Sequence, residues 1–589
     1  MNTRESDILQ TILLKGFVNQ RILSDDSGYS LGMVNRSLHE LNRNGYIDAD
    51  CRPTDLAASL LKDRAPRNAV ILAAGFGMRM VPINLSTPKA LLEVRGEVLI
   101  ERMIRQLHAA GVTDITVIVG FMKERFEYLI DEYGVELVVN PDYSRKNNLS
   151  SLALVADRLG NTYIIPSDIW TNSNPFSNCE MYSWYMVSDD TDSESTVRVN
   201  RRKELVKVSE NTNGNRMIGI SYLLEKDAAD IVGRIKKYAS DPAFADEFWE
   251  CALYKGDRMD LPAKVVSSDD AVEINTFEQL REFDRMSNHL HSDALDVIAK
   301  VFSTSPDQIT DIQVLKKGMT NRSFLFAVKG NKYIMRIPGE GTDQLIDRAQ
   351  EAEVYRTISG HGLCDDPIYI DPSNGYKITK FLDGVRVCDT DDMNDLERCM
   401  AKLRQFHEMK LSVSHSFDLF GQIDFYEKLR KGNPSIYKDY ALTKEHVMSL
   451  KSFIERERKD WCLTHIDAVP DNFLFYRCDD GEELQLTDWE YSGMQDPHVD
   501  IAMFCIYSLF NKDQVDQLID IYFRGECSKS ERTKIYSYIA VCGLLWSNWC
   551  EFKSLYGVEF GEYSLRQYRY AKDYYQFAIE LMGSDTNRE

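Results

Sequence analysis

The sequence lacks several features that would assign whole classes of function. It has no CxxC pair, and its twelve cysteines are scattered over 589 residues, which argues against a disulfide framework or a thiolate metal site and favours a reducing compartment. It has no run of about 18 apolar residues and no basic N-terminal segment followed by an apolar one. We therefore expect a cytoplasmic protein without a membrane partner.

Positive charge is also scarce. Lys and Arg number 70 against 92 Asp and Glu, which gives a formal net charge of -22. Such a chain repels nucleic acid and anionic membranes overall, so a purely DNA-binding role is disfavoured. Apolar residues make up 43% of the chain, which is ordinary for a globular protein.

The length predicts several domains, because a single hydrophobic core stops growing at roughly 250 to 300 residues. A polar segment at 64–68 and the end of a helical stretch near 292 divide the sequence into three regions. We predict domains at 1–66, 67–292 and 293–589.

The first region shows helical patterns at 6–15, 19–25 and 30–44, and 46–53 is compatible with a small hairpin. This order resembles a winged helix-turn-helix, and the resemblance implies a recognition helix at 30–45 with Asn35, Arg36 and His39 exposed. Residues 1–66 nevertheless hold eight basic and nine acidic side chains, whereas DNA binding needs a basic face. DNA binding and a small regulatory or interface module both stay open.

The second region alternates apolar runs at 69–75, 114–120, 136–140 and 162–166 with helical stretches, which predicts an α/β domain with parallel strands and crossover helices. In the helix expected at 97–110, Leu99, Met103 and Leu107 form one apolar stripe, and Gly111 ends it.

A glycine loop follows the first of these strands. Gly75 and Gly77 let the backbone approach phosphate oxygens, and Arg79 and Lys89 add positive charge. This combination suits attack on an α-phosphate with pyrophosphate leaving, because charge growing on the leaving group must be neutralised. The residues that we expect to contact the nucleotide here are Ala73, Ala74, Gly75, Gly77, Arg79 and Lys89.

Residues 68–290 resemble the sugar-phosphate nucleotidyltransferases, and more narrowly the bacterial phosphocholine cytidylyltransferases. The resemblance implies a Rossmann-like domain that uses CTP, with Asn148 and Ser150 of the segment 140–155 beside the nucleotide. It also places a Mg²⁺-binding carboxylate at Asp168. Met78 stands where many relatives carry Ser or Thr, which leaves the backbone donors of the loop in place.

A second departure concerns the metal. Asn275 stands where many relatives have another Mg²⁺-binding Asp, and an uncharged amide oxygen is a weaker ligand. Either Asp269, Asp270 or Glu273 compensates, or one metal suffices. Trp184 and Tyr185 are candidates for walls around a quaternary ammonium, which aromatic faces attract, although core packing explains them equally well.

The third region contains the most informative spacing. Asp467 is followed five residues later by Asn472, and Asp488 comes at the end of an apolar strand. This is the order of base, metal ligand and metal ligand in kinase-like phosphotransferases. We expect Asp467 to accept the proton of an alcohol, and Asn472 and Asp488 to hold Mg²⁺ on ATP. The neighbouring His465 is expected to orient the loop.

Upstream segments fall in the matching order. Strand patterns lie at 312–315, 323–328 and 332–337, and the turn with Thr320 and Asn321 can lie over phosphates. Arg336 occupies the position of the kinase strand lysine and can clamp phosphates. Its partner is Glu351 or the rival Glu353, which lie on different helix faces. Backbone from Lys380 to Leu382 is expected to meet adenine.

Residues 295–580 resemble the aminoglycoside phosphotransferase and choline kinase superfamily, most closely the bacterial choline kinases, and a bilobal kinase-like fold is implied. In choline kinases, tryptophans and a tyrosine enclose the trimethylammonium group, which implies that role for Tyr491, Trp546 and Trp549. Core packing on the uncharged helix 535–550 is the alternative. Tyr507 stands where some choline kinases have a glutamate near the cation.

The two sites predict consecutive reactions on small molecules. Choline and ATP would give phosphocholine, and phosphocholine and CTP would give CDP-choline, both with Mg²⁺, for decoration of bacterial surface polymers. The alternatives are ethanolamine or another amino alcohol in the same reactions, and a transcriptional regulator whose enzyme-like domains sense ligands.

Overall fold

The structure is a computed structural model that describes residues 1–589 except 78–79, 81, 84–86, 194, 210–211, 285–286, 288–291, 316–320, 339–345, 365, 458–459, 479–480, 556–559 and 587–589. It divides into two compact units, Met1–Val314 and Leu315–Glu589. The boundaries that the sequence suggests after residues 66 and 292 stay predictions.

The first unit begins with short helices close to the predicted ranges. In chain order they are α1 (Thr3–Lys15), α2 (Gln20–Ser27), α3 (Leu31–Arg43) and α4 (Asp55–Arg64). An antiparallel bridge between Ile47 and Pro53 lies where the hairpin was expected. On α3, the side chains of Asn35, Arg36 and His39 are exposed, as predicted. The winged-helix interpretation itself remains a prediction.

A partly buried cluster of polar side chains connects these helices to the rest of the unit. The carboxylate of Asp7 accepts hydrogen bonds from the hydroxyls of Tyr29 and Tyr182 at 2.5 and 2.6 Å, and Lys203 Nζ lies 2.9 Å from it. Met181 belongs to the same apolar cluster as Ile8 of α1. The N-terminal helices therefore contact the rest of the first unit through both polar and apolar side chains.

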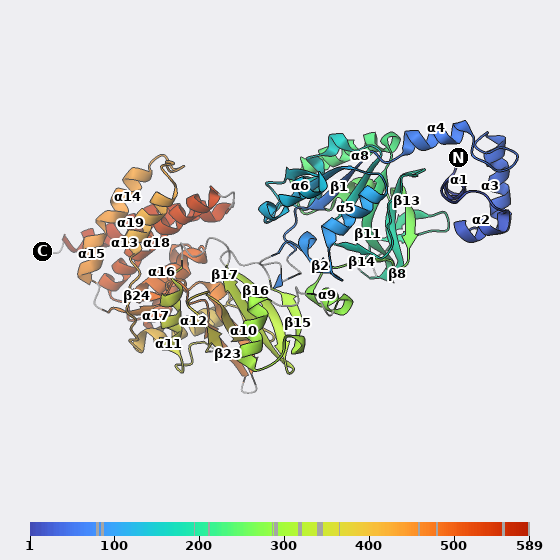
Figure 1. Cartoon of the computed structure of the whole chain (residues 1–589). Helices are drawn as coiled ribbons and strands as arrows, with labels where there is room; N and C mark the ends of the chain where they lie inside the picture. Colours follow the sequence, from blue (N-terminus) through green and yellow to red (C-terminus); the bar gives the residue numbers. More distant parts are fainter. Residues whose placement is uncertain are drawn as a thin grey trace. The chain divides into compact units, whose positions relative to one another are not determined.

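The centre of the first unit is a ten-stranded mixed sheet (Figure 1). Its order is β5-β4-β1-β6-β11-β8-β13-β10-β9, with β12 paired to β13. Pairs β1–β4, β1–β6 and β4–β5 are parallel, which confirms the pattern predicted from the four apolar runs. The strands are β1 (Asn68–Ala73), β4 (Asp114–Val119), β5 (Glu136–Val139), β6 (Thr162–Pro166), β8 (Trp184–Asp192), β9 (Val197–Val199), β10 (Glu204–Lys207), β11 (Gly214–Leu223), β12 (Tyr254–Lys255) and β13 (Arg258–Val266).

Helices cover both faces of this sheet. Ile71 of β1 packs in one apolar cluster with α5 (Leu99–Ala109), whereas its neighbour Leu72 packs in another with α8 (Glu225–Ala239). Successive strand residues point to opposite faces, so a strand covered on both sides must be apolar throughout. The remaining elements of the unit are β2 (Glu93–Val94), β3 (Glu97–Val98), β7 (Ile169–Thr171), β14 (Ala271–Glu273), β15 (Ile309–Val314), α6 (Tyr128–Tyr133), α7 (Asn148–Ala153), α9 (Phe277–Phe283) and α10 (Asp293–Phe302).

The second unit begins with antiparallel strands and one helix. Strands β16, β17, β19 and β18 pair in that order. Their bounds are β16 (Asn321–Val328), β17 (Asn331–Pro338), β18 (Tyr369–Ile370) and β19 (Lys377–Lys380), and the helix is α11 (Arg348–Ile358).

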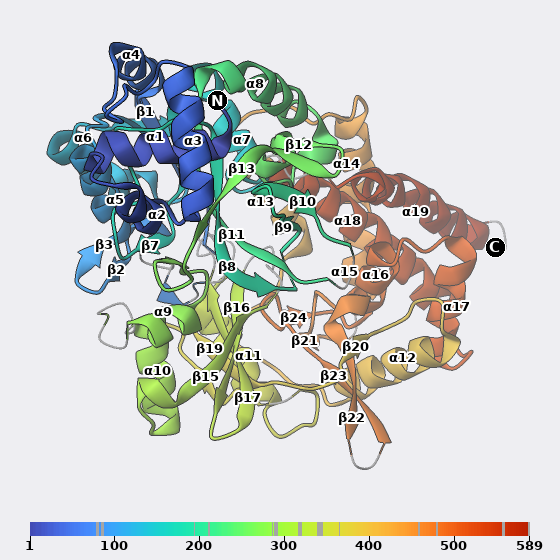
Figure 2. The same ribbon diagram turned by 90° about the vertical axis from the view of Figure 1, so that its right-hand side faces the viewer.

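The rest of the second unit is mainly helical. Figure 2 shows α18 (Lys529–Ser554) and α19 (Glu562–Thr586) side by side. The uncharged stretch 535–550 of α18 lies inside the core, as predicted for a buried helix. The other elements are α12 (Met393–Glu408), α13 (Leu419–Leu429), α14 (Tyr440–Ser449), α15 (Lys451–Glu457), α16 (His498–Tyr507), α17 (Lys512–Phe523), β20 (Arg386–Val387), β21 (Cys462–Thr464), β22 (Phe473–Cys478), β23 (Gly481–Leu486) and β24 (Gly493–Gln495). Among the described residues, no helix combines the length and apolar character that a membrane span requires.

Candidate active sites

In the first unit, the glycine turn lies against the predicted lysine. Ala73 ends β1, Ala74 is buried behind it, and Gly75 is exposed. Gly77 has φ +59°, and a Cβ added there would lie 3.2 Å from Cβ of Lys89. A residue with a side chain at 77 would therefore be strained and would press on Lys89. Met78 and Arg79 lie outside the described residues.

The structure brings Lys89, Asp168 and Asn275 together. Lys89 Nζ donates to Asp168 Oδ2 at 2.5 Å and to Asn275 Oδ1 at 2.8 Å. Asp168 directly precedes β7, and Asn275 lies two residues after β14, which pairs with β7. Strand pairing therefore places two residues that are more than 100 positions apart around one ammonium group.

These groups also fit a divalent cation. Asp168 Oδ1 is buried and has no hydrogen-bond partner within the part of the chain that the structure describes. An unpaired carboxylate oxygen beside an amide oxygen is the kind of donor set that Mg²⁺ takes, with phosphate and water completing it.

Asn148 and Ser150 lie on α7 and are engaged by neighbouring backbone. Asn148 Oδ1 accepts the N–H of Trp249 at 2.8 Å, and Ser150 Oγ donates to the carbonyl of Asn147 at 2.7 Å. Asn148 thus positions the segment that carries Glu250.

The predicted pair of aromatic walls is separated by the strand. Trp184 and Tyr185 are neighbours on β8, so they point to opposite faces, and both are buried in different apolar clusters. The Trp184 ring already carries Lys264 Nζ at 3.9 Å from its centroid, and its N–H donates to Glu180. One pocket walled by both side chains is therefore not formed.

Tyr185 meets a carboxylate that sequence reasoning missed. Its hydroxyl donates to Glu250 Oε1 at 3.0 Å, while Glu250 Oε2 is buried without a hydrogen-bond partner in the described part of the chain. Burial, together with the nearby carboxylate of Glu273, raises the pKa of Glu250 to about 7. Two acidic groups close to one another would be stabilised by a bound cation.

In the second unit, the catalytic triplet predicted from spacing converges. Asn472 Nδ2 donates to Asp467 Oδ2 at 3.2 Å, and the N–H of Thr487 donates to the carbonyl of Asn472 at 2.9 Å, which brings Asp488 alongside. Desolvation raises the pKa of Asp467 to about 7, with the carboxylates of Asp488 and Glu490 adding to the shift. Carboxylates that repel each other beside an amide oxygen again fit Mg²⁺.

The loop that carries Asp467 is held by a buried carboxylate. Asp500 of α16 accepts the N–H groups of His465 and Ile466 at 3.0 and 2.7 Å. Ile466 has φ 71°, a left-handed conformation that a β-branched residue rarely adopts. The His465 ring is fully buried and contacts the carbonyl of Thr487, which suits the orienting role expected for it.

The choice between Glu351 and Glu353 is resolved by burial. Glu351 receives both terminal nitrogens of Arg336, one of them at 2.8 Å, and Arg348 Nη1 at 3.0 Å. Glu353 faces away and accepts hydrogen bonds from Ser414. Glu351 is therefore the partner of Arg336.

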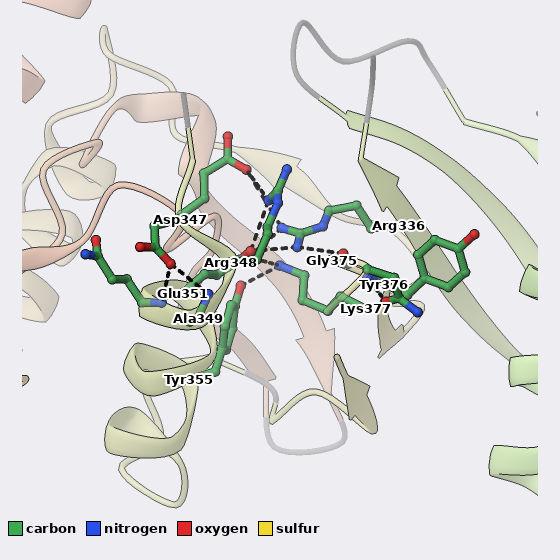
Figure 3. Close-up of polar contacts among 12 residues, drawn as sticks. Arg336, Asp347, Arg348, Ala349, Glu351, Tyr355, Gly375, Tyr376 and Lys377 are labelled. Carbon is green, nitrogen blue, oxygen red and sulfur yellow. Dashed lines mark hydrogen bonds and ion pairs between the residues drawn. The ribbon is translucent and has the colours of Figure 1, made fainter. Parts of the chain in front are cut away.

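A second buried cation, missed in the sequence, stands beside Arg336 (Figure 3). Arg336 and Lys377 are directly paired across β17 and β19. Lys377 Nζ donates to the hydroxyl of Tyr355 at 2.7 Å and lies 3.5 Å from Glu351. Desolvation and the adjacent Arg336 lower the pKa of Lys377. The cluster also contains Glu490, which lies 3.5 Å from Arg348.

One cavity of about 860 Å³ connects these groups with the aromatic residues that were predicted to bind the substrate. Arg336, Lys377 and the predicted hinge residues Lys380 and Leu382 line one part of it. Thr320 lies outside the described residues, and Asn321 begins β16. Among the described aromatic side chains that line the cavity, six are called the aromatic wall: Tyr491, Tyr507, Trp546, Trp549, Phe560 and Tyr563. Phe560 and Tyr563 escaped prediction because no spacing links them to Trp546.

These two arrangements define a transferase with two nucleotide-phosphate sites, one of the nucleotidyltransferase kind and one of the kinase kind. Family models agree: residues 69–169 match the MobA-like NTP transferase domain, and residues 312–523 match choline/ethanolamine kinase.

Individual relatives cover the two halves separately. The choline-phosphate cytidylyltransferase of Streptococcus pneumoniae is 33% identical over 222 residues, which are 37% of this chain and 97% of the relative. Protein LicA of Haemophilus influenzae is 27% identical over 42% of this chain and 96% of its own length. The crystal structure of choline kinase LicA from Streptococcus pneumoniae is 26% identical, with a TM-score of 0.41, and covers 50% of this chain and all of that one. The chain belongs to the choline-phosphate cytidylyltransferase family, and it also carries a choline/ethanolamine kinase domain.

Proposed function

We propose that the protein phosphorylates choline with ATP and then transfers CMP from CTP to the phosphocholine formed, giving CDP-choline and pyrophosphate. The observation that carries this proposal is the cavity of the second unit, which joins Asp467 to the aromatic wall. A quaternary ammonium has no N–H to donate and is attracted by aromatic faces, so this cavity suits choline.

In the kinase step, Asp467 accepts the proton of the choline hydroxyl while the oxygen forms a bond to the γ-phosphorus and the bond to the β-phosphate oxygen breaks. Arg336, fixed by Glu351, and Lys377 neutralise the phosphates of ATP. Asn472 and Asp488 would hold Mg²⁺, which supplies charge neutralisation on the phosphates when bound.

In the cytidylyl step, a phosphate oxygen of phosphocholine attacks the α-phosphorus of CTP, and pyrophosphate leaves. Backbone N–H groups of the glycine turn and the ammonium of Lys89 bind the phosphates. Asp168 and Asn275 would hold Mg²⁺ there. Glu250, held by the hydrogen bond from the Tyr185 hydroxyl, and Glu273 supply negative charge for the trimethylammonium group.

Two alternatives have support of their own. Ethanolamine fits because an aromatic site also accepts a primary ammonium, and substrate competition distinguishes it from choline. A regulator with sensor domains would use the exposed face of α3, and this alternative predicts that the catalytic carboxylates are expendable.

We also propose that the enzyme acts in the cytoplasm, where both nucleotides are available, and that CDP-choline donates phosphocholine to bacterial surface polymers.

The decisive experiment follows phosphocholine and CDP-choline separately when purified protein is incubated with choline, ATP, CTP and Mg²⁺. Asp467→Ala should abolish phosphocholine formation yet leave conversion of added phosphocholine intact. Lys89→Ala should do the reverse. The matched controls are Asp513→Ala and Lys123→Ala, which change exposed side chains of the same units and should leave both rates near wild type. If both site variants kept both activities, the assignment would be wrong.

A further inference from the structure

The aromatic wall is continuous, although its members come from four segments of the chain. Neighbouring ring centroids lie 6.4 Å apart for Tyr491 and Trp546, and 5.6 Å apart for Trp546 and Trp549. The chain of contacts continues over 5.1, 6.4 and 5.9 Å through Trp549, Phe560, Tyr563 and Tyr507. The wall thus begins three residues after Asp488 and ends at Tyr507.

Tyr507 connects the far end of the wall to a carboxylate. Its hydroxyl donates to Asp471 Oδ2 at 3.0 Å, and Asp471 lines the same cavity as Asp467. Burial and the charge of Asp471 raise the pKa of Tyr507, so the hydroxyl stays protonated and keeps donating. The side chain of Asp471 is exposed, and among the described residues its Oδ1 makes no hydrogen bond or ion pair, so this oxygen is available to a ligand.

The other carboxylates of the cavity have different tasks. Four carboxylates line it within the described residues: Asp467, Asp471, Asp488 and Glu490. Asp467 takes up a proton in the proposed reaction, and Asp488 is assigned to the metal. Glu490 lies beside Arg336 and Arg348. Asp471 is the carboxylate left to face the organic part of the substrate.

Aromatic rings alone discriminate weakly between a cation and a neutral group of the same shape, because the hydrophobic part of the contact is common to both. A fixed carboxylate adds attraction for the cation only. We propose that Asp471, oriented by the Tyr507 hydroxyl, is the counter-ion of the substrate onium group and sets selectivity for cationic over neutral alcohols. This inference rests on the proposed choline kinase activity and adds a residue to it.

The test compares choline with its neutral carbon isostere, 3,3-dimethylbutan-1-ol. The measured quantity is the ratio of kcat/KM for choline to kcat/KM for the isostere. We expect Asp471→Asn to lower this ratio about tenfold, which corresponds to about 1.4 kcal/mol. Tyr507→Phe keeps the ring and removes the hydrogen bond, so the ratio should fall by a smaller factor, about threefold. The exposed control Asp513→Asn should leave the ratio unchanged.

The ratio separates recognition of charge from damage to the site. Asp471 adjoins Asn472, and a disturbed metal site or a loosened fold would lower turnover of both alcohols in parallel. An unchanged ratio in Asp471→Asn would overturn the role of Asp471, and an unchanged ratio in Tyr507→Phe alone would overturn the orienting role of its hydroxyl. Either result leaves the proposed function intact. A wild-type enzyme that formed no phosphocholine would refute the proposed function, and this inference with it.

Discussion

Replacing Glu351 by Gln removes the negative charge on which three buried cations converge. The side chains of Arg336 and Glu351 are 7% and 1% exposed, so solvent cannot compensate for the loss. Breaking a buried ion pair by removing one partner costs about 3–5 kcal/mol. For a unit of 275 residues (315–589), this corresponds to a drop of roughly 6–20 °C in the unfolding temperature, at about 2–4 °C per kcal/mol.

Glu353→Gln is the matched control, because it makes the same chemical change two residues away on the same helix. Its side chain is 29% exposed and its hydrogen bonds to Ser414 are worth about 1 kcal/mol. Calorimetry on the full chain measures both variants, and the KM for ATP should rise only in Glu351→Gln, since Arg336 then loses its orientation. CDP-choline formation from added phosphocholine should be unchanged in both.

The reasoning fails if Glu353→Gln destabilises the protein as much as Glu351→Gln, or if Glu351→Gln loses less than about 1 kcal/mol. The pH dependence provides a second check. The surrounding cations hold the pKa of Glu351 at about 2, below its usual 4.5. The stabilisation is therefore complete above pH 4.5 and is lost as the pH falls toward 2.

Two further predictions concern recognition of the substrate cation. Because the pKa of Glu250 is raised to about 7, its carboxylate becomes protonated as the pH falls from 8 to 6. The KM for phosphocholine should therefore rise over that range in initial-rate assays of CDP-choline formation, and a KM of the wild type that does not change with pH would contradict this. In Glu250→Gln the KM should be high at every pH in this range. Trp546→Leu should raise the KM for choline by about 2- to 30-fold and leave the KM for ATP unchanged, since a cation–π contact contributes about 0.5–2 kcal/mol. Equal KM values for choline in wild type and variant would show that Trp546 only packs in the core.

Short-range patterns in the sequence predicted which side chains lie together at the candidate kinase site. The spacing of Asp467, Asn472 and Asp488 reflects a loop and hairpin whose geometry is local, so the order of residue types was sufficient. The four parallel strands could also be predicted from the sequence, because strands covered on both faces are apolar throughout.

Sequence patterns could not settle what depends on tertiary packing. Glu351 and Glu353 are the same residue type on the same helix, and only the packing of α11 against β17 determines which of them binds Arg336. Neighbouring aromatics on β8 looked like two walls of a pocket, but strand alternation sends them to opposite faces of a sheet covered on both sides. Lys377 became significant only through its pairing with Arg336 across two strands.

The left-handed backbone at Ile466 implies a tension between durability and turnover. A β-branched residue held there costs on the order of 1–3 kcal/mol, which the two hydrogen bonds to Asp500 offset. Glycine at this position would remove the cost and stabilise the protein against heat, yet it would also loosen the backbone that positions Asp467, the proposed proton acceptor. Attempts to raise the thermal stability of the enzyme should therefore keep Ile466 and introduce stabilising substitutions at other positions.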